Sequence, residues 1–248
     1  MNASVPHRDV LSLISEEATA PGDAPELGGW MQRLCRAATR ELEGSGAGVS
    51  IMSDQGNLTV LAASSPATEM IEQLQFTLGE GPCRDAHDLG APVLTPDLSE
   101  AARTRWPGYA SAVQGHGVRA VFAFPLQLGA ARIGALDVYR DRTGELSAPL
   151  LAQALAFAEA AMNAVLDAQQ RSNESEEPEA PTEATELEGV FDGRFDVYQA
   201  QGMVQVQLGV SLGEAMARLR GYAFAHNRPL TSVAADVLAR RLIFEPDL

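Results

Sequence analysis

The sequence contains no lysine, so all 18 of its basic side chains are arginine. It has only two cysteines, Cys35 and Cys83, too few for a disulfide framework. The four histidines are scattered without the spacing of a metal-binding motif. No uninterrupted apolar stretch is long enough to cross a bilayer, and the first residues do not have the pattern of a signal peptide. We therefore expect a cytoplasmic protein with no metal, no cofactor and no membrane association.

Acidic residues outnumber basic ones, and the formal net charge is −15 at pH 7. Residues 1–170 have 11 arginines and 20 acids, residues 171–189 have one arginine and seven acids, and residues 190–248 have six of each. Phosphate contacts require basic groups, so this balance excludes a protein that binds nucleic acid along its whole length. The neutral C-terminal segment is the least acidic part, and it would have to gather its arginines on one face.

The length is enough for one sizeable domain plus a small one. The helical and strand patterns described below indicate an α+β protein. We place an N-terminal segment at 1–23 and a larger domain at 24–170. An acidic linker without apolar anchors follows at 171–189, where self-repulsion favours an extended chain. A small all-α domain occupies 190–248.

The C-terminal domain has three short amphipathic helical patterns. Ser211 followed by Glu214 is a capping box, which predicts that the second helix begins there. The inward positions predicted for the second and third helices are Leu212, Ala215, Leu219 and Ala223, then Val233, Ala234, Val237 and Leu242. Arg218 and Arg220 fall on opposite flanks of the apolar stripe of the second helix, where they can meet a phosphate backbone.

This segment resembles the ANTAR family, the RNA-binding output domain of transcription antitermination regulators. The resemblance is carried by Ala200, Gln201, Gly202, residues 208–211 (LGVS), Glu214, Ala215, Leu219, Arg220, Tyr222, Ala223, Asn227, Leu230, Val233, Ala234 and Val237. It implies a three-helix module that binds hairpin loops of RNA. The residues expected to take part are Gln201, Arg218, Arg220, Tyr222, His226, Asn227 and Arg228.

Two features qualify the expected RNA contacts. Gln201 stands where the family usually has lysine, so one phosphate-reaching charge is missing. Tyr222 or His226 could stack on an unpaired base of an RNA loop. Alternatively, they could pack in the core of the domain or at the end of the helix. Surface roles for the arginines also stay open.

Residues 24–170 combine helical patterns with five strand candidates, at 48–53, 58–63, 92–95, 120–128 and 133–139. The last two are separated by a short loop and predict a hairpin. Within it, Phe122 and Phe124 alternate with Val121 and Ala123, so one pair faces the core and the other can line a ligand cavity.

This order of elements resembles a GAF domain. The most specific residues are 78–83 (LGEGPC), Pro92, Val93, Pro96, Asp97, residues 124–126 (FPL) and Gly134. The resemblance implies an antiparallel sheet with flanking helices and a pocket for a small molecule. We expect an unknown ligand to bind near Trp106, Tyr109, Phe122 and Phe124. A GAF domain followed by an ANTAR domain is an arrangement of actinobacterial regulators.

A long alanine-rich helix after Ser147 has an a/d pattern typical of a coiled-coil or bundle seam. Its positions are Leu151, Leu155, Ala158, Met162 and Val165, and a second stripe consists of Leu27, Met31, Leu34 and Ala38. Because neither stripe has an obvious cover within the chain, we expect a homodimer.

These patterns predict a signal-responsive regulator without catalytic residues, whose GAF domain senses a small molecule and whose ANTAR domain binds hairpin RNA. One alternative is a protein-interaction or DNA-binding transcriptional regulator without RNA binding. Another alternative is an enzyme in which Cys83 and His87, which lie one helical turn apart, form a thiolate–imidazole pair. We favour the interpretation of Cys83 as a small buried residue in a turn.

Overall fold

The larger domain is built on a five-stranded sheet in the order β2-β1-β5-β4-β3, with every neighbouring pair antiparallel. The strands are β1 (Gly46–Met52), β2 (Leu58–Ala63), β3 (Val93–Thr95), β4 (Ala120–Leu128) and β5 (Ala131–Arg140). The computed structural model describes residues 9–20, 23, 26–52, 58–129, 131–174, 195–226 and 228–245. All five strands predicted from the sequence are present.

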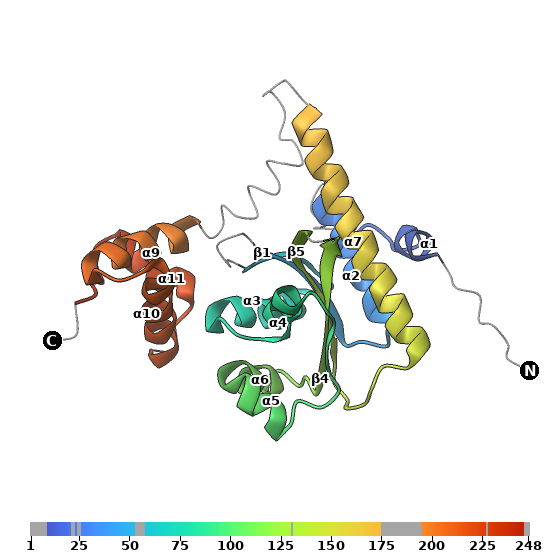
Figure 1. The fold of residues 1–248 in the computed structure, drawn as a ribbon, viewed down its shortest axis with the longest axis horizontal. Helices are drawn as coiled ribbons and strands as arrows, with labels where there is room; N and C mark the ends of the chain where they lie inside the picture. The colour runs from blue at the N-terminus through green and yellow to red at the C-terminus, as the bar shows by residue number, and fades with distance from the viewer. Residues whose placement is uncertain are drawn as a thin grey trace, which may run out of the picture.

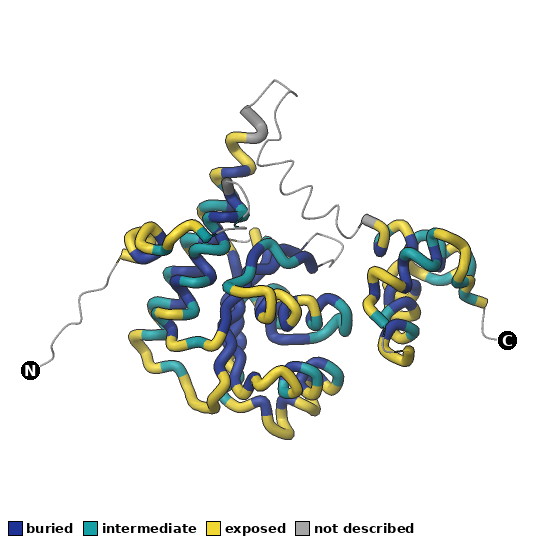
Figure 2. Tube along the Cα trace, turned by 180° about the vertical axis from the view of Figure 1, so that it is seen from behind, coloured by how far each residue is buried: buried dark blue, intermediate teal, exposed yellow. Residues whose placement is uncertain are grey.

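Helices cover both faces of this sheet (Figure 1). One face carries α1 (Val10–Ser15), α2 (Glu26–Glu41) and α7 (Ala148–Glu174). The other face carries α3 (Pro66–Leu78), α4 (Pro82–Leu89), α5 (Glu100–Arg105) and α6 (Pro107–Gly115). Because helices lie on both sides, β1 is buried at every position, and Figure 2 shows the strands as the deeply buried centre of the domain.

The apolar stripe of α7 packs on its own domain. Ala158, Met162 and Val165 lie in the core between α7, α2 and the sheet, each at most 3% exposed. Our interpretation of this stripe as an uncovered dimer seam is therefore wrong, since the same spacing also suits a helix that packs on a sheet. The stripe of α2 is covered in the same core, whereas Leu155 is 44% exposed.

The stretch from Ala148 to Arg171 in α7 is long and apolar enough to cross a membrane. Length and composition alone do not distinguish such a helix from a helix of a protein core. This differs from the sequence expectation, which counted only uninterrupted apolar residues.

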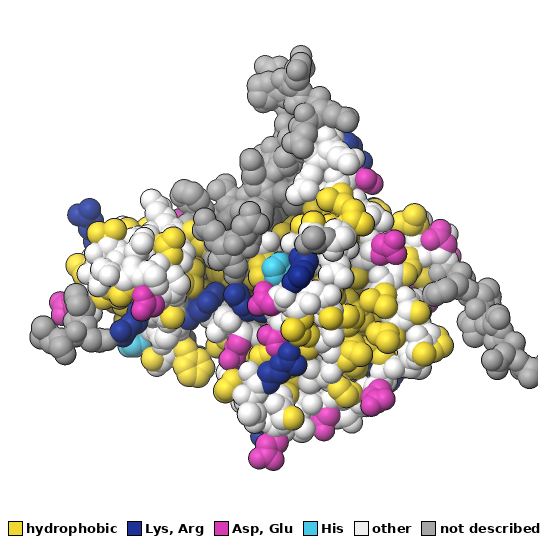
Figure 3. Space-filling model, in the orientation of Figure 1, with side chains coloured by type: hydrophobic (Ala, Val, Ile, Leu, Met, Phe, Trp, Pro, Cys, Tyr) yellow, Lys and Arg dark blue, Asp and Glu magenta, His cyan; other side chains and the backbone are white. Residues whose placement is uncertain are grey.

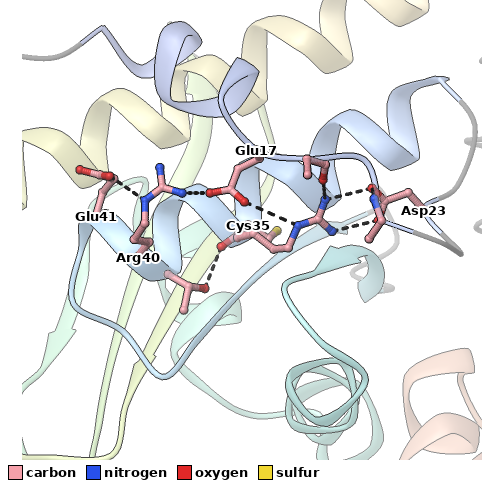
Figure 4. A network of polar contacts seen from close by, with 9 residues as sticks. Glu17, Asp23, Cys35, Arg40 and Glu41 are labelled. Atoms are coloured by element: carbon pink, nitrogen blue, oxygen red, sulfur yellow. Dashed lines mark hydrogen bonds and ion pairs between the residues drawn. The ribbon is translucent and has the colours of Figure 1, made fainter.

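The segment before α2 is tied to that helix by ion pairs (Figure 4). The Arg36 guanidinium donates to both carboxylate oxygens of Asp23 at 2.9 Å and also to the carbonyl of Ala18 at 3.0 Å. One turn later, Arg40 pairs with Glu17 and donates to Glu41 at 2.9 Å. These contacts fix the connection between α1 and α2 on one face of the domain.

The C-terminal residues form a bundle of three helices, α9 (Phe195–Leu208), α10 (Leu212–Ala225) and α11 (Leu230–Leu238). The predicted capping box is confirmed: the Ser211 hydroxyl accepts from the Glu214 amide, and the Glu214 carboxylate accepts from the Ser211 amide at 3.0 Å. The inward stripe of α10 differs at its start, because Leu212 is 43% exposed while Met216 is buried. Leu212 is the first residue of the helix and lies at the edge of the bundle.

Candidate functional site

Arg220 of α10 lies where the bundle meets the larger domain. Its guanidinium carbon is 5.8 Å from the centre of the Phe76 ring on α3. It also packs on Gly79, the left-handed residue that ends α3, where an added Cβ would lie 2.6 Å from Arg220 Nη1. Burial and the nearby Arg84 lower the pKa of Arg220 to about 10, and its Nε has no hydrogen-bond partner in the described part of the chain. The α/β domain therefore covers a cationic side chain of the bundle.

A groove of about 650 Å³ surrounds this contact. Its walls come from both domains, and they are Thr77, Leu78, Gly79, Glu80, Pro107, Gly108, Ala217, Arg220, Gly221 and Phe224. Figure 3 shows arginine side chains gathered at the junction between the two domains. Phe224 is 69% exposed beside it, so the edge of the junction is partly apolar.

The other residues expected to bind RNA take different places. Arg218 is exposed on α10. Gln201 is 9% exposed inside the bundle, where its amide donates to the carbonyl of Leu212 at 2.8 Å. It links α9 to the start of α10, so in this arrangement its side chain does not face a ligand.

At the C-terminal end of α10, Tyr222 and His226 stack with ring centres 3.9 Å apart. Phe244 meets the Tyr222 ring edge-on at 5.6 Å. Arg228 donates to Asp236 at 2.5 Å, so its charge is already paired. Asn227, the remaining residue expected to bind RNA, lies outside the described residues.

The four residues expected to bind a small molecule lie on opposite faces of the sheet. Phe122 and Phe124 point into the core shared with α2 and α7. Trp106 and Tyr109 belong to the other core, where their rings meet at right angles with centres 6.2 Å apart. The structure therefore does not form a single site from all four. Val121 and Ala123, the alternate positions of β4, face the Tyr109 side.

Behind α3, on the Tyr109 side of the sheet, lies a polar cluster that the sequence analysis missed. Glu72 and Asp137 are fully buried there. Glu72 accepts from the hydroxyls of Ser50 at 2.9 Å and Tyr139 at 2.7 Å. Asp137 accepts from the Gln75 amide. Two sequence features point to the cluster: an aspartate inside an apolar strand, and acid and amide groups on the inward side of α3.

Burial raises the pKa of both carboxyls. The pKa of Glu72 rises from 4.5 to about 7, although the hydrogen bonds from Tyr139 and Ser50 oppose the change. The pKa of Asp137 is raised well above its ordinary value by burial and then by the nearby Glu72. Gly48 of β1 makes room for this arrangement, because a Cβ there would overlap the Glu72 carboxylate.

The alternative of an enzyme acting through Cys83 finds little support in this geometry. The thiol is fully buried, and its pKa is raised well above the ordinary value by burial and by Asp137 and Glu72. A nucleophilic cysteine needs the opposite environment, which stabilises the thiolate. Among the described residues, no group of three His, Cys, Asp or Glu side chains is arranged to hold a metal ion.

Comparison with known proteins agrees with this architecture. A family model of the GAF domain matches residues 26–165, and one of the ANTAR domain matches residues 185–238. No curated protein matches the chain. Since the GAF match spans more than half of the sequence, the chain belongs to the GAF domain family. Its second match makes it a GAF–ANTAR protein, in which a sensory domain is joined to the domain known from RNA-binding antitermination regulators.

Solved structures show the same fold in the larger domain. A domain assigned to a two-component sensor histidine kinase of Sinorhizobium meliloti 1021 is 16% identical, with a TM-score of 0.52 over 62% of this chain and 100% of its own. The GAF domain of a phosphoenolpyruvate-protein phosphotransferase from Acinetobacter is 10% identical, with a TM-score of 0.51 over 67% and 94%. The corresponding domain from Coxiella burnetii is 14% identical, with a TM-score of 0.50 over 66% and 97%.

Proposed function

We propose that this protein is a cytoplasmic, signal-responsive regulator of transcription antitermination. The GAF domain senses a small molecule, and the ANTAR domain binds hairpin loops of RNA. The observation that carries the proposal is the contact of Arg220 with α3, because it lets the sensory domain cover a cationic side chain of the output domain.

The candidate RNA surface is the exposed side of α10. Arg218 is exposed there, and Arg220 joins it once it leaves α3. Each guanidinium can form two charge-assisted hydrogen bonds to a phosphate. The stacked Tyr222 and His226 lie at the C-terminal end of the same helix, where an unpaired base of an RNA loop could join the stack. Because the module is electrically neutral overall, loss of one arginine matters more here than in a basic domain.

Arg220 also gives the sensory domain a means of control. Burial removes water from its guanidinium, which contacts the Phe76 ring and the Gly79 backbone and is attracted by Tyr198, while Arg84 repels it. We expect a closed and an open state of similar free energy for this contact, so that a ligand that alters α3 shifts their populations. In the closed state Arg220 is unavailable to RNA.

Substitution of the ring below the guanidinium tests this function. Phe76→Leu removes the aromatic face but keeps most of the apolar volume. The full chain with this change should bind a two-hairpin RNA several-fold more tightly than the wild type. Adding Arg220→Ala should remove the gain. Phe157→Leu is the matched control, since Phe157 is buried on the opposite face of the sheet. Equal RNA affinity for Phe76→Leu and the wild type would contradict control through Arg220.

The alternative of a protein-interaction or DNA-binding regulator is favoured by one observation. Phe224 and Val206, 69% and 82% exposed, give the bundle apolar surface that a protein partner could cover. RNA binding by the full chain, measured at several salt concentrations, separates the two functions, because a protein-interaction module shows no salt-dependent RNA binding.

A homodimer would present two ANTAR modules to two hairpins. We place its interface on the outer side of α2 and α7, where a groove of about 1250 Å³ is lined by Trp30, Ala156 and Ala160 among others. Linking two modules raises the effective concentration of the second to about the millimolar range.

A further inference from the structure

Glu72 and Asp137 form a buried pair of carboxyl groups without a cation. Both are fully buried, and in the described part of the chain neither pairs with an arginine or histidine. Tyr139 lies between them, with its hydroxyl 2.7 Å from Glu72 and 3.5 Å from Asp137. Two carboxylates this close cannot both remain charged in an apolar interior, so the pair needs either protons or a bound cation.

Two polar atoms of this cluster lack partners within the described residues. They are Asp137 Oδ1 and the Tyr109 hydroxyl, which lies near the Tyr139 hydroxyl but beyond ordinary hydrogen-bond distance; both side chains are fully buried. Tyr109 approaches the pair from α6, and burial, followed by the nearby carboxyls of Asp137 and Glu72, raises the pKa of its hydroxyl well above the ordinary value. Buried polar groups without partners are rare in folded proteins, because each loses its hydrogen bonds to water. Here they lie in one cluster beside two acids.

We propose that this cluster is the ligand site of the GAF domain and that its ligand carries a primary ammonium group. The inference rests on the proposed sensing of a small molecule. An ammonium has three N–H donors, and Asp137, Glu72 and the Tyr109 hydroxyl provide three acceptors in one buried cluster. A quaternary ammonium has no N–H donor, and an anion would be repelled by both acids.

Binding of the ammonium exchanges a cation for a proton. Without a bound cation, burial favours the protonated form of both acids and raises both pKa values, that of Glu72 to about 7. When an ammonium enters, one carboxyl loses its proton to solvent, so one positive charge replaces another. The other titratable groups around the pair are Tyr139, Tyr109, Cys83 from α4 and Cys35 from α2. Their pKa values are all raised, so none of them competes for the released proton near neutral pH.

The same helix connects this site with the output domain. Glu72 and Gln75 of α3 belong to the cluster, while Phe76 and Gly79 at its end contact Arg220. The loop after α3 is in turn tied to α6, because the Glu80 carboxylate accepts from the Gly108 and Tyr109 amides at 2.7 and 2.8 Å. A ligand that enters beside Tyr109 therefore displaces the segment on which Arg220 packs.

Calorimetry with small amines tests the ligand class directly on the full chain without RNA. The probes are primary alkylammonium chlorides from methyl to butyl, with tetramethylammonium chloride as control. Primary ammonium ions should bind with release of about one proton, so that Kd falls by up to about tenfold per pH unit between pH 5 and 7. Tetramethylammonium should not bind.

Substitution by residues of similar shape without the charge or the hydroxyl tests whether each side chain of the cluster binds the ammonium. Asp137→Asn and Glu72→Gln should each weaken binding at least tenfold, and Tyr109→Phe several-fold. Tyr109→Phe is also expected to fold well, because it removes a hydroxyl that has no hydrogen-bond partner among the described residues. Glu69→Gln on the exposed side of α3 is the matched control. The inference is overturned if no primary ammonium binds, if tetramethylammonium binds equally well, or if all three cluster variants bind like the wild type. A neutral or anionic compound that copurifies with the chain would also overturn it, while leaving small-molecule sensing in place.

Discussion

Replacing Glu72 by glutamine should make the GAF domain more stable at pH 8 and should flatten the dependence of its stability on pH. Folding moves the Glu72 carboxyl from water into the core and raises its pKa from 4.5 to about 7. The folded state therefore binds the proton more tightly than the unfolded chain does. The contribution of this proton to stability is complete below pH 4.5 and is lost as the pH rises through 7.

The size of the effect follows from the two pKa values. One pKa unit corresponds to about 1.4 kcal/mol, so the change from 4.5 to about 7 amounts to roughly 3 kcal/mol lost between pH 4.5 and 8. Glutamine cannot ionise, and Glu72→Gln therefore avoids this loss. It gives up part of the hydrogen bonding from Ser50 and Tyr139, about 1 kcal/mol. The variant should be about 1–2 kcal/mol more stable than the wild type at pH 8 and slightly less stable at pH 5.

Urea unfolding from pH 5 to 8.5 measures this difference. Both tryptophans, Trp30 and Trp106, belong to the GAF domain, so their fluorescence reports its unfolding apart from the bundle. The urea midpoint should move while the slope of the transition stays constant. Glu69→Gln removes an exposed charge from the same helix and should retain the wild-type pH profile. The reasoning is refuted if wild-type stability is flat between pH 6 and 8, or if Glu72→Gln keeps the full slope.

Three further predictions concern packing. Gln201→Ala leaves the Leu212 carbonyl without its donor and should destabilise the bundle by about 1–3 kcal/mol. Thermal unfolding followed by circular dichroism measures this loss. An unchanged melting temperature would show that Gln201 does not stabilise the bundle. Ser211→Ala should lower the stability of α10 by about 0.5–2 kcal/mol in the same melts, and Ser211→Asp, which can also cap, should largely restore it. Ala160→Arg on the outer face of α7 should yield monomers by light scattering, and a persisting dimer would place the interface elsewhere.

The sequence predicted the elements of this fold better than their partners. The capping box at Ser211 and the β4–β5 hairpin are local patterns, and both are confirmed. The face of β4 could not be predicted in the same way, because helices cover both sides of the sheet and both sets of alternating residues are apolar. Phe122 and Phe124 were therefore grouped with Trp106 and Tyr109, which lie on the opposite face of the sheet. The spacing of Ala158, Met162 and Val165 likewise specified an apolar stripe but not the surface that covers it.

The candidate sites depend on contacts between residues far apart in the sequence. Glu72 and Asp137 meet only because α3, which packs on β1 and β2, reaches the side chains of the neighbouring strand β5. Arg220 meets Gly79 only through the contact of the two domains. The polarity of Asp137 within an apolar strand and the acid and amide groups on the inward side of α3 were the local clues. For Gln201, the comparison with lysine drew attention to a lost charge, whereas its amide forms a hydrogen bond inside the bundle.

The salt dependence of RNA binding tests the central claim most directly. The full chain and the double variant Arg218→Ala/Arg220→Ala are titrated with a two-hairpin RNA at several salt concentrations. If the two arginines contact phosphates, wild-type affinity falls steeply with salt, and the double variant binds more weakly with a log–log slope shallower by roughly 1.5–2. Circular dichroism should show unchanged helical content in the variant. Equal affinity and equal slope for the two proteins would contradict the assignment of α10 as the RNA surface, and no salt-dependent binding by either would contradict RNA binding itself.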